Sequence, residues 1–312
     1  MRSTLRWLAR RFSHYSPGSV EPIPALLADP ARGRPPSRRH RARSPKLSPV
    51  SVPAGLPHPR SGLGEERDRA AAQSPYTVRL GWGESGAATL APSSDVVVVV
   101  DVITFTTAVA VAAERGCAVY PHRWDDGGAA RLAESLGIEL AVSRSHVDAD
   151  HPYSLSPETL SRLPLGSAIV LPSPNGAAVS VACATAGALV VAGSLRNAAA
   201  AARFARSAGR SISVIAAGER WSDGSLDPAL EDLLGAGAII DGLRRRRRSP
   251  EARAAAAAYL RARHQGLRRT LMETVSALEL RRRGYQQELE WACALNCSTV
   301  VPVLGEGAFR SR

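Results

Sequence analysis

From Tyr76 onward, short β-branched runs alternate with alanine-rich stretches of helical length. Five consecutive valines at 96–100 form an unbroken apolar run, which is typical of a strand buried on both faces. Strands are expected at 76–82, 96–100, 118–120, 168–171, 188–192, 211–216 and 299–304, and helices at 106–115, 126–136, 177–186, 198–207, 229–243, 250–264, 266–283 and 286–295. Strands separated by helices of about ten residues need right-handed crossovers. The pattern therefore predicts an α/β fold with a mostly parallel sheet and helices on both faces.

The first 74 residues differ from the rest of the chain. They carry 11 of the 22 prolines, and their apolar residues show no sustained periodicity. Such a segment cannot offset its ordering entropy, so residues 1–75 are predicted to be a disordered arginine- and proline-rich extension before a folded region at 76–312. Residues 1–16 are arginine-rich and free of acids, a composition shared with transit peptides. An inert extension, a targeting segment and a binder of anionic partners all stay open for this tail.

The net charge of +12 is concentrated in that tail. Residues 1–74 hold 14 basic and 5 acidic side chains, whereas the remaining residues hold 26 and 23. The folded region is therefore nearly balanced, and specific nucleic-acid binding is not expected. The single lysine, Lys46, lies in the tail, which excludes Walker loops, Schiff-base enzymes and phosphatases of the haloacid-dehalogenase type.

The cysteines and histidines suggest neither a disulfide framework nor a zinc site. The four cysteines include no C-x-x-C pair, and the histidines of the folded region lack the spacing that places two ligands on one helix face.

No apolar run approaches the roughly 18 residues of a membrane span. We expect a cytoplasmic protein with reduced thiols and no membrane partner, for which a homo-oligomer stays open.

Polar residues follow four of the expected strands, at the edge where an open α/β sheet binds its ligands. These residues are Asp101, Thr106, Thr107, Asn175, Gly176, Arg196, Asn197, Glu219, Arg220, Glu231 and Asp232. Helix capping would explain any one of the serine, threonine, asparagine or aspartate residues there. Capping does not explain Asp101 directly after five valines, or the group of carboxylates Glu219, Asp227, Glu231 and Asp232. Free helix N–H groups suit a phosphate, and several carboxylates suit Mg²⁺.

Four spaced motifs resemble the 2-phosphosulpholactate phosphatase family. They are VVVVDVITFTT at 97–107, SPNG at 173–176, SLRNA at 194–198, and AAGE at 216–219 with LED…GAG at 230–237. The resemblance covers residues 76–312. It implies a two-part α/β fold and magnesium-dependent hydrolysis of a phosphate ester on a small acid, in the family's case 2-phospho-3-sulfolactate.

The sequence departs from the family pattern at two places. Thr104 and Phe105 stand where the pattern has an arginine followed by an alanine, so one cation that could hold an anionic group is missing. Asn296 stands where an aspartate is common. These departures motivate an alternative function, in which the chain has lost turnover and only binds a phosphorylated acid.

The expected enzyme is a magnesium-dependent phosphatase acting on a small anionic phosphorylated substrate. The metal ligands would be Asp101, Glu231 and Asp232, and Asp101 and Glu219 would be catalytic. Donors to the phosphate would be Thr106, Thr107, Asn175, Gly176 and Asn197. Arg196 or Arg220 would pair with the carboxylate or sulfonate of the substrate.

Three rival motifs are given other interpretations. The glycines at 81–86 match G-x-G-x-x-G, but only eight residues with Pro92 among them separate Gly86 from Asp95, so we expect a glycine-rich turn. The Cys117-x5-Arg123 spacing lies in a strand-like run that contains a proline, which argues against a cysteine phosphatase. The arginine runs at 244–248 and 281–283 are interpreted as solvated faces, because no aromatic residues interleave with them.

Overall fold

The structure is a computed structural model that describes residues 66–67, 70–124, 127–244 and 246–312. The predictions for residues 1–65, including the targeting role of 1–16, lie outside the described residues. Residues 72–75 form turns that contact the first strand. The amide of Gln73 donates to the carbonyl of Leu80 at 2.7 Å and accepts from its N–H at 3.3 Å. Residues just before Tyr76 therefore contact the strand with which the folded region begins.

The described elements alternate between strands and helices as the hydrophobic pattern predicts. The strands are β1 (Val78–Trp82), β2 (Val96–Val100), β3 (Ala118–Arg123), β4 (Glu139–Leu140), β5 (Ala168–Ser173), β6 (Leu189–Gly193), β7 (Ile212–Ala216), β8 (Glu219–Arg220), β9 (Leu226–Asp227), β10 (Pro302–Gly305) and β11 (Ala308–Ser311). The helices are α3 (Gly83–Leu90), η1 (Ala91–Ser93), α4 (Phe105–Glu114), α5 (Gly128–Leu136), η2 (Arg144–His146), α6 (Pro157–Leu160), α7 (Gly176–Thr185), α8 (Ala198–Ala208), α9 (Leu230–Gly242), α10 (Pro250–Met272), α11 (Val275–Arg282) and α12 (Glu288–Cys293).

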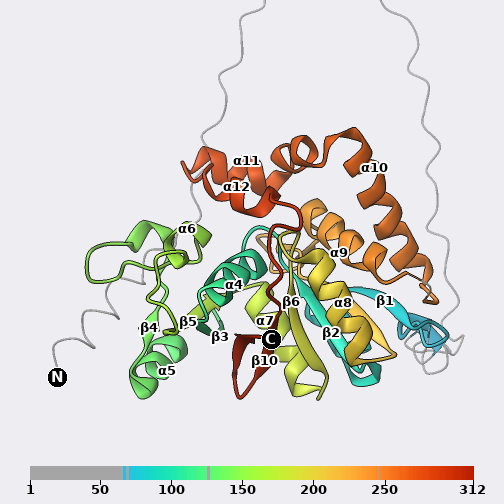
Figure 1. Ribbon diagram of the computed structural model, residues 1–312, viewed down its shortest axis with the longest axis horizontal. Coiled ribbons are helices and arrows are strands. Elements are labelled where there is room, and N and C mark those ends of the chain that lie inside the picture. The colour runs from blue at the N-terminus through green and yellow to red at the C-terminus, as the bar shows by residue number, and fades with distance from the viewer. Residues whose placement is uncertain (1–65, 68–69, 125–126, 245) are drawn as a thin grey trace, which may run out of the picture. The chain divides into compact units, whose positions relative to one another are not determined.

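One nine-stranded sheet carries the fold, in the order β1-β7-β2-β6-β10-β11-β3-β5-β4 (Figure 1). The strands β1, β7, β2 and β6 are parallel to one another, and so are β3, β5 and β4. The antiparallel hairpin β10–β11 joins these two parallel halves, since β10 pairs with β6 and β11 with β3. The mostly parallel α/β fold is confirmed, and its two parts are two halves of a single sheet.

The valine run in β2 divides the core between the two faces of the sheet. Successive side chains of a strand point to opposite faces. Val96, Val98 and Val100 belong to a core cluster with residues of α8, α9 and α10, whereas Val97 and Val99 belong to a second cluster with residues of α3, α4 and α7. All five valines are fully buried, as the sequence predicts for a strand covered on both faces.

Three local features differ from the sequence expectations. The glycine-rich stretch after β1 is a helix, α3, rather than a turn, and Pro92 is accommodated in the short η1 that follows it. The expected strand at 299–304 begins at Pro302 and continues through a turn into β11. The helix expected at 250–264 continues past a break at Gly266, where φ is +107°, as α10 to Met272, and the second half of the helix expected at 266–283 is the separate helix α11.

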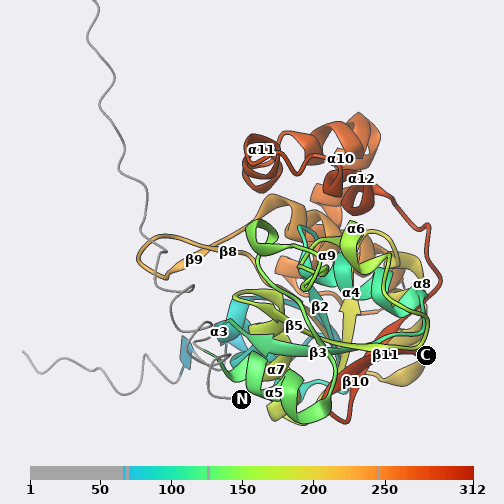
Figure 2. The same cartoon turned by 90° about the vertical axis from the view of Figure 1, so that its left-hand side faces the viewer.

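The C-terminal helices α10, α11 and α12 lie at one end of the sheet, next to α9 (Figure 1). A turn of the view by 90° shows the β8–β9 hairpin projecting from the body beside α3 (Figure 2). Among the helices of the described residues, none is both long and apolar enough to cross a membrane. The loops that follow β2, β5 and β7 meet at the carboxyl edge of the sheet, where the sequence predicts the site.

The linking hairpin is expected to be essential for stability. Phe309 in β11 is fully buried, and its ring meets that of Phe105 edge-on with 6.3 Å between centroids. We expect Phe309→Ala to lower the free energy of unfolding by about 3–5 kcal/mol, because it leaves a cavity between the two halves. Urea unfolding measures this change. Leu165→Ala, at a side chain that is 78% exposed, is the control and should change stability by less than about 0.5 kcal/mol. Equal effects of the two substitutions would show that the hairpin is not part of the cooperative core.

Candidate active site at the carboxyl edge of the sheet

Asp101, the residue directly after β2, is buried and held by two backbone groups. Its Oδ1 accepts the N–H of Phe105 at 3.0 Å, and its Oδ2 accepts the N–H of Gly176 at 2.9 Å. The first bond caps the start of α4, and the second reaches the start of α7. One carboxylate therefore joins two helix N-termini and fixes the loop after β2 against the loop after β5.

Gly176 is required at this contact. A Cβ on residue 176 would lie 2.6 Å from Asp101 Oδ2 and 2.5 Å from Cδ1 of Phe105. Real Cβ atoms do not approach other atoms this closely, so only glycine allows the backbone N–H to reach the carboxylate. Close packing against Asp101 thus explains the glycine in the Ser-Pro-Asn-Gly motif.

Asp232 repeats the arrangement on the other side of the same loop. Its Oδ1 accepts the N–H of Val102 at 2.7 Å, and its Oδ2 accepts the N–H of Gly218 at 2.9 Å. The side chain is 3% exposed and lies in the first turn of α9. Asp232 therefore connects the loop after β2 with the turn after β7.

Two glutamates complete a group of four carboxylates. Glu231, in the first turn of α9, is only 2% exposed. Glu219, in β8, accepts a hydrogen bond at Oε2 from the side-chain amide of Asn175 at 2.7 Å. Asp101, Glu219 and Asp232 each carry an unfavourable interaction with the charge of Glu231.

Burial and mutual repulsion raise the pKa values of this group. Burial raises the pKa of Asp101 to about 6, and the charge of Glu231 adds to the effect against the two backbone hydrogen bonds. Burial, then the charge of Asp101, raises the pKa of Glu219 to about 8. The pKa of Asp232 also lies well above its usual value, because of burial and the charges of Asp101 and Glu231. Such shifts are characteristic of functional sites.

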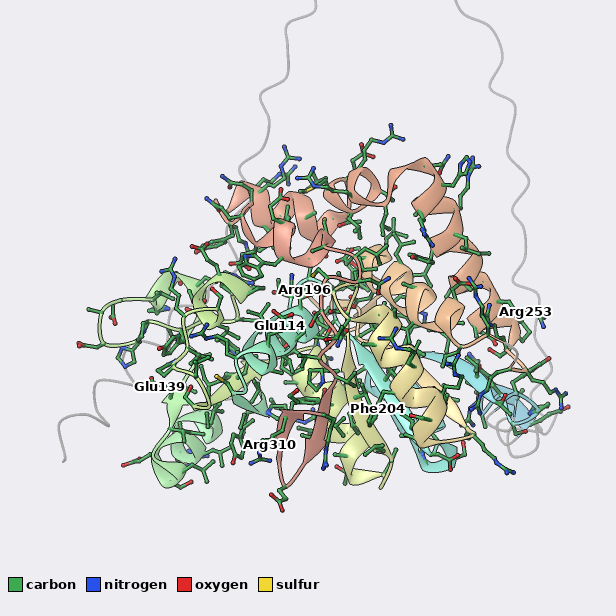
Figure 3. All side chains as sticks on the ribbon, viewed as in Figure 1. Glu114, Glu139, Arg196, Phe204, Arg253 and Arg310 are labelled. Carbon is green, nitrogen blue, oxygen red and sulfur yellow. The ribbon has the colours of Figure 1, made fainter. Side chains whose placement is uncertain are left out.

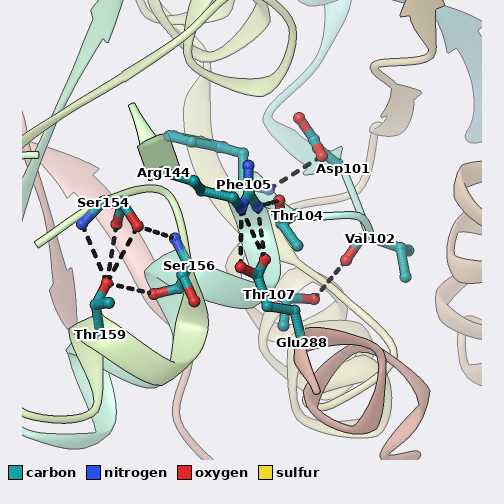
Figure 4. A network of polar contacts seen from close by, with 10 residues as sticks. All are labelled: Asp101, Val102, Thr104, Phe105, Thr107, Arg144, Ser154, Ser156, Thr159 and Glu288. Carbon is teal, nitrogen blue, oxygen red and sulfur yellow. Dashed lines mark hydrogen bonds and ion pairs between the residues drawn. The ribbon is translucent and has the colours of Figure 1, made fainter. Parts of the chain in front are cut away.

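Arg144 supplies a cation on the Asp101 side of this group, where Figure 4 shows it with Thr104 and Glu288. Its guanidinium contacts both carboxylate oxygens of Glu288, with a closest distance of 2.6 Å, and donates to the hydroxyl of Thr104 at 2.8 Å. The charge of Arg144 lowers the pKa of Asp101. Neither Arg144 nor Glu288 was expected from the sequence, because no motif surrounds them and 144 positions separate them.

A cavity of about 240 Å³ lies between α3, α7 and the β8–β9 hairpin, and Glu219 is the member of the carboxylate group that lines it. Asn175, Glu219 and Arg220 line it, so the structure brings together three of the residues predicted for the site. Arg220 donates to Glu84 at 2.7 Å, and its side chain stays 42% exposed. Arg220 can thus exchange its surface ion pair for an anionic group in the cavity.

The two threonines of the motif have roles inside the loop. The hydroxyl of Thr106 donates to the carbonyl of Asp101 at 2.7 Å, and that of Thr107 donates to the carbonyl of Val102 at 2.8 Å. Both side chains are fully buried. Because each hydroxyl hydrogen is already donated to the backbone, this geometry gives no support to the predicted role in phosphate binding.

Arg196 and Asn197 are also engaged in structural contacts. Asn197 is fully buried; its amide donates to the carbonyls of Ala192 and Val300, and its oxygen accepts the N–H of Ser194. Arg196 donates to both oxygens of Glu114 at 3.1 and 3.2 Å, and the two side chains lie side by side beneath the C-terminal helices (Figure 3). The structure does not bring either residue to the cavity lined by Arg220.

The alternative catalytic and metal motifs do not form sites. Cys117 is buried, its thiol donates to the carbonyl of Pro164 at 3.2 Å, and the residues up to Arg123 form strand β3 rather than a phosphate-binding loop. All four cysteines are free thiols. Among the described residues, no three His, Cys, Asp or Glu side chains gather as a ready-made metal-binding group.

A mostly parallel α/β sheet with buried carboxylates and helix N-termini at its carboxyl edge places this chain among the open α/β proteins, which bind their ligands at that edge. The family model of the 2-phosphosulpholactate phosphatases matches residues 87–307, which is well over half of the chain. The chain therefore belongs to the 2-phosphosulpholactate phosphatase family, a family of phosphoric ester hydrolases. No protein of curated function matches the chain.

The close approach of Gly176 to Asp101 can be tested by adding one methyl group. Gly176→Ala is expected to lower the free energy of unfolding by about 1–3 kcal/mol, because the new Cβ forces the loops after β2 and β5 apart. Thermal and urea unfolding measure the loss. Gly305→Ala is the matched control, since no atom lies within 4 Å of its added Cβ. Equal stability of the two variants would show that the loops separate without cost.

The raised pKa values predict how stability depends on pH. Asp101 and Glu219 bind protons more tightly in the folded state than in the unfolded state, so the folded protein without divalent ions should lose stability as pH rises from about 4 to about 8. Glu219→Gln should reduce the loss above about pH 5 by roughly 1 kcal/mol or more. Urea unfolding in EDTA at several pH values measures the slope. Glu134→Gln, on the exposed face of α5, should leave the slope unchanged, and a slope that Glu219→Gln also leaves unchanged would contradict the assignment.

Proposed function

We propose that the protein is a magnesium-dependent phosphatase that hydrolyses a phosphate monoester of a small carboxylic or sulfonic acid, such as 2-phosphosulfolactate. The observation that carries the proposal is the gathering of Glu231 with Asp101, Glu219 and Asp232, four little-exposed carboxyl groups whose charges repel one another. A cation held among them would remove that repulsion. The site is therefore short of positive charge. We also propose that the enzyme is cytoplasmic.

The residues present fit Mg²⁺ in their chemistry. Carboxylate oxygens are hard donors, and Mg²⁺ in phosphate-handling sites is held by one or two carboxylates together with waters and substrate phosphate. Glu231 would be the principal ligand, because both oxygens of Asp101 and of Asp232 already accept backbone N–H groups. Asp101 and Asp232 have further lone pairs, but no three such side chains form a ready-made group among the described residues, so they would contribute through bridging waters or small side-chain shifts. When bound, Mg²⁺ supplies Lewis-acid stabilisation of the phosphoryl oxygens.

Glu219 and Asp101 are suited to opposite proton-transfer roles. With a pKa of about 8, Glu219 carries a proton near neutral pH and can donate it to the oxygen that leaves phosphorus. With a pKa of about 6, Asp101 is mostly ionised there and can orient an attacking water or accept its proton. Asn175 holds the carboxyl group of Glu219 in the cavity through its amide. Different environments thus separate the acid from the base.

Arg220 provides the cation for the acid group of the substrate. It lines the cavity next to Glu219 and is half exposed, so it can form a two-pronged contact with a carboxylate or sulfonate. Arg196, the other arginine expected in this role, is paired with Glu114. The geometry therefore favours Arg220 over Arg196.

A second candidate is a protein that binds a phosphorylated acid without turning it over. The internal hydrogen bonds of Thr106 and Thr107 favour it, because they leave the phosphate with fewer donors than the sequence suggests. Thr104 in place of the family's arginine acts in the same direction. Binding without phosphate release would distinguish this candidate.

The test of the phosphatase is Glu231→Gln, which keeps size and removes the charge. We expect phosphate release from small phosphorylated carboxylic and sulfonic acids to fall by about 10² or more, since a metal ligand is lost. The same variant without divalent ions should be as stable as the parent or more stable, because it removes one of four carboxylates that repel one another. Released phosphate and melting temperature, each with and without Mg²⁺, are the measurements.

Glu134→Gln is the control and should retain turnover and Mg²⁺-induced stabilisation. If Glu231→Gln keeps both, the carboxylate group is not the metal site. If the parent releases phosphate equally well in EDTA, the magnesium requirement is wrong. If no substrate is turned over but one raises the melting temperature in the presence of Mg²⁺, the binding protein is the correct assignment.

A further inference from the structure

A second, strongly basic hollow lies at the opposite edge of the sheet from the carboxylates. It has a volume of about 610 Å³ and opens to solvent. Its lining comprises one aromatic residue, one acid and five arginines: Tyr76, Asp241, Arg244, Arg246, Arg247, Arg248 and Arg253. The sequence interpretation of the arginine run as a solvated face did not anticipate that Arg244 and Arg246–Arg248 line a common space.

The topology places this hollow far from the candidate active site. Tyr76 comes just before β1, at the amino end of the parallel strands, whereas Asp101 and Glu219 follow the carboxyl ends. Helix α9 starts at the carboxylates with Glu231 and ends near Arg244. Arg253 lies in the first turns of α10, and Figure 3 shows it beside β1 at the edge of the molecule. The two sites are therefore separated by the length of α9.

The arginines are fixed mainly by backbone carbonyls rather than by acids. Arg246 donates to the carbonyls of Arg210 and Arg206 at 2.7 and 2.9 Å, and Arg248 donates to that of Asp241 at 3.1 Å. These contacts hold the guanidinium groups without neutralising them. Each of these arginines keeps further N–H donors for a ligand.

Acidic partners are scarce around the hollow. The one carboxylate in its lining is Asp241, which lies 3.7 Å from the guanidinium of Arg244. The side chain of Arg247 makes no hydrogen bond or ion pair with the residues that the structure describes. Other exposed arginines, such as Arg283 and Arg162, pair with glutamates one helical turn away. Five cations facing one acid repel one another, and a multivalent anion would remove that repulsion.

We propose that this hollow is a binding site for a small polyphosphate anion, either inorganic or the phosphate chain of a nucleotide. Guanidinium groups bind phosphate oxygens through paired N–H donors, and several around one space match several phosphates. The volume is adequate for a ligand of that size. A nucleic-acid strand fits less well, because single-stranded binding sites combine a groove with several stacking rings, and Tyr76 is the one ring in this lining.

The test is binding of tripolyphosphate to the full chain by calorimetry in EDTA, which keeps divalent ions from the carboxylates. We expect one ligand per chain and a Kd that increases at least about tenfold in the double variant Arg244→Gln/Arg247→Gln. Both side chains are exposed, so folding should be preserved, which the melting temperature verifies. The matched control is Arg281→Gln/Arg282→Gln in α11, which removes the same charge at exposed positions and should change Kd by less than about twofold.

A second arm with ATP separates the two ligand sources. Equal Kd values for ATP and tripolyphosphate would assign recognition to the phosphate chain alone, and much tighter ATP binding that Tyr76→Ala removes would assign it to a nucleotide.

The proposal is overturned if the Arg244/Arg247 double variant binds tripolyphosphate like the parent, or if the control loses as much affinity. It is also overturned if Glu231→Gln abolishes binding, which would place the ligand at the carboxylates, or if single-stranded DNA binds more tightly with increasing length. Because these readouts do not involve turnover, they are independent of the phosphatase proposal.

Discussion

Two buried aspartates, each accepting two backbone N–H groups, are the constraint on which the carboxyl edge of this sheet depends. Asp101 binds the first turns of α4 and α7, and Asp232 binds the loop after β2 and the turn after β7. A buried N–H without a partner costs about as much as a lost hydrogen bond, so replacing either aspartate with an apolar residue would leave two such groups. The strand ends that carry the site are therefore held together by carboxyl oxygens.

The same charges create the chemistry of the site. Burial and repulsion raise the pKa of Asp101 to about 6 and that of Glu219 to about 8, although Asp101 also receives two stabilising hydrogen bonds. A carboxylate used for structure thus increases the proton affinity of a carboxylate available for catalysis. The loops can approach one another only where a buried acceptor binds their N–H groups. Each such acceptor here is a carboxyl group, so the residues that hold the loops together also add charge to the site.

Much of the fold could be predicted from the sequence because its signals are local. The valine run at 96–100 specifies a strand with two covered faces, and the alanine-rich helices follow from periodicity. The linking hairpin β10–β11 could not be predicted in the same way. Its pairing with β6 and β3 depends on contacts across more than 100 residues, as in Val303 with Val191 and Phe309 with Val119. Helix α3 was also missed, since its glycines resemble a turn and tertiary packing of Ala87 and Leu90 overrides that preference.

The candidate site was predictable in position more than in role. The rule that ligands bind at the carboxyl ends of parallel strands correctly placed Asp101, Asn175, Glu219 and Asp232 near one another. It could not distinguish side chains that face a ligand from those that stabilise their own loop. The internal hydrogen bonds of Thr106 and Thr107 depend on loop conformation, which residue types alone do not specify. Long-range pairs such as Arg144 with Glu288 leave no signal in a single sequence.

Position 104, where the sequence departs from its family, is also where the C-terminal helices reach the site. The hydroxyl of Thr104 accepts a hydrogen bond from Arg144, whose guanidinium is held by Glu288 at the start of α12 (Figure 4). The same guanidinium lies 5.7 Å from the centre of the Tyr285 ring. A cation therefore stands beside the loop after β2, but it comes from another part of the chain. Because the charge of Arg144 lowers the pKa of Asp101, the proton affinity of that aspartate depends on how α12 packs. The C-terminal helices, which contribute no strand to the sheet, thereby become part of the electrostatics of the site.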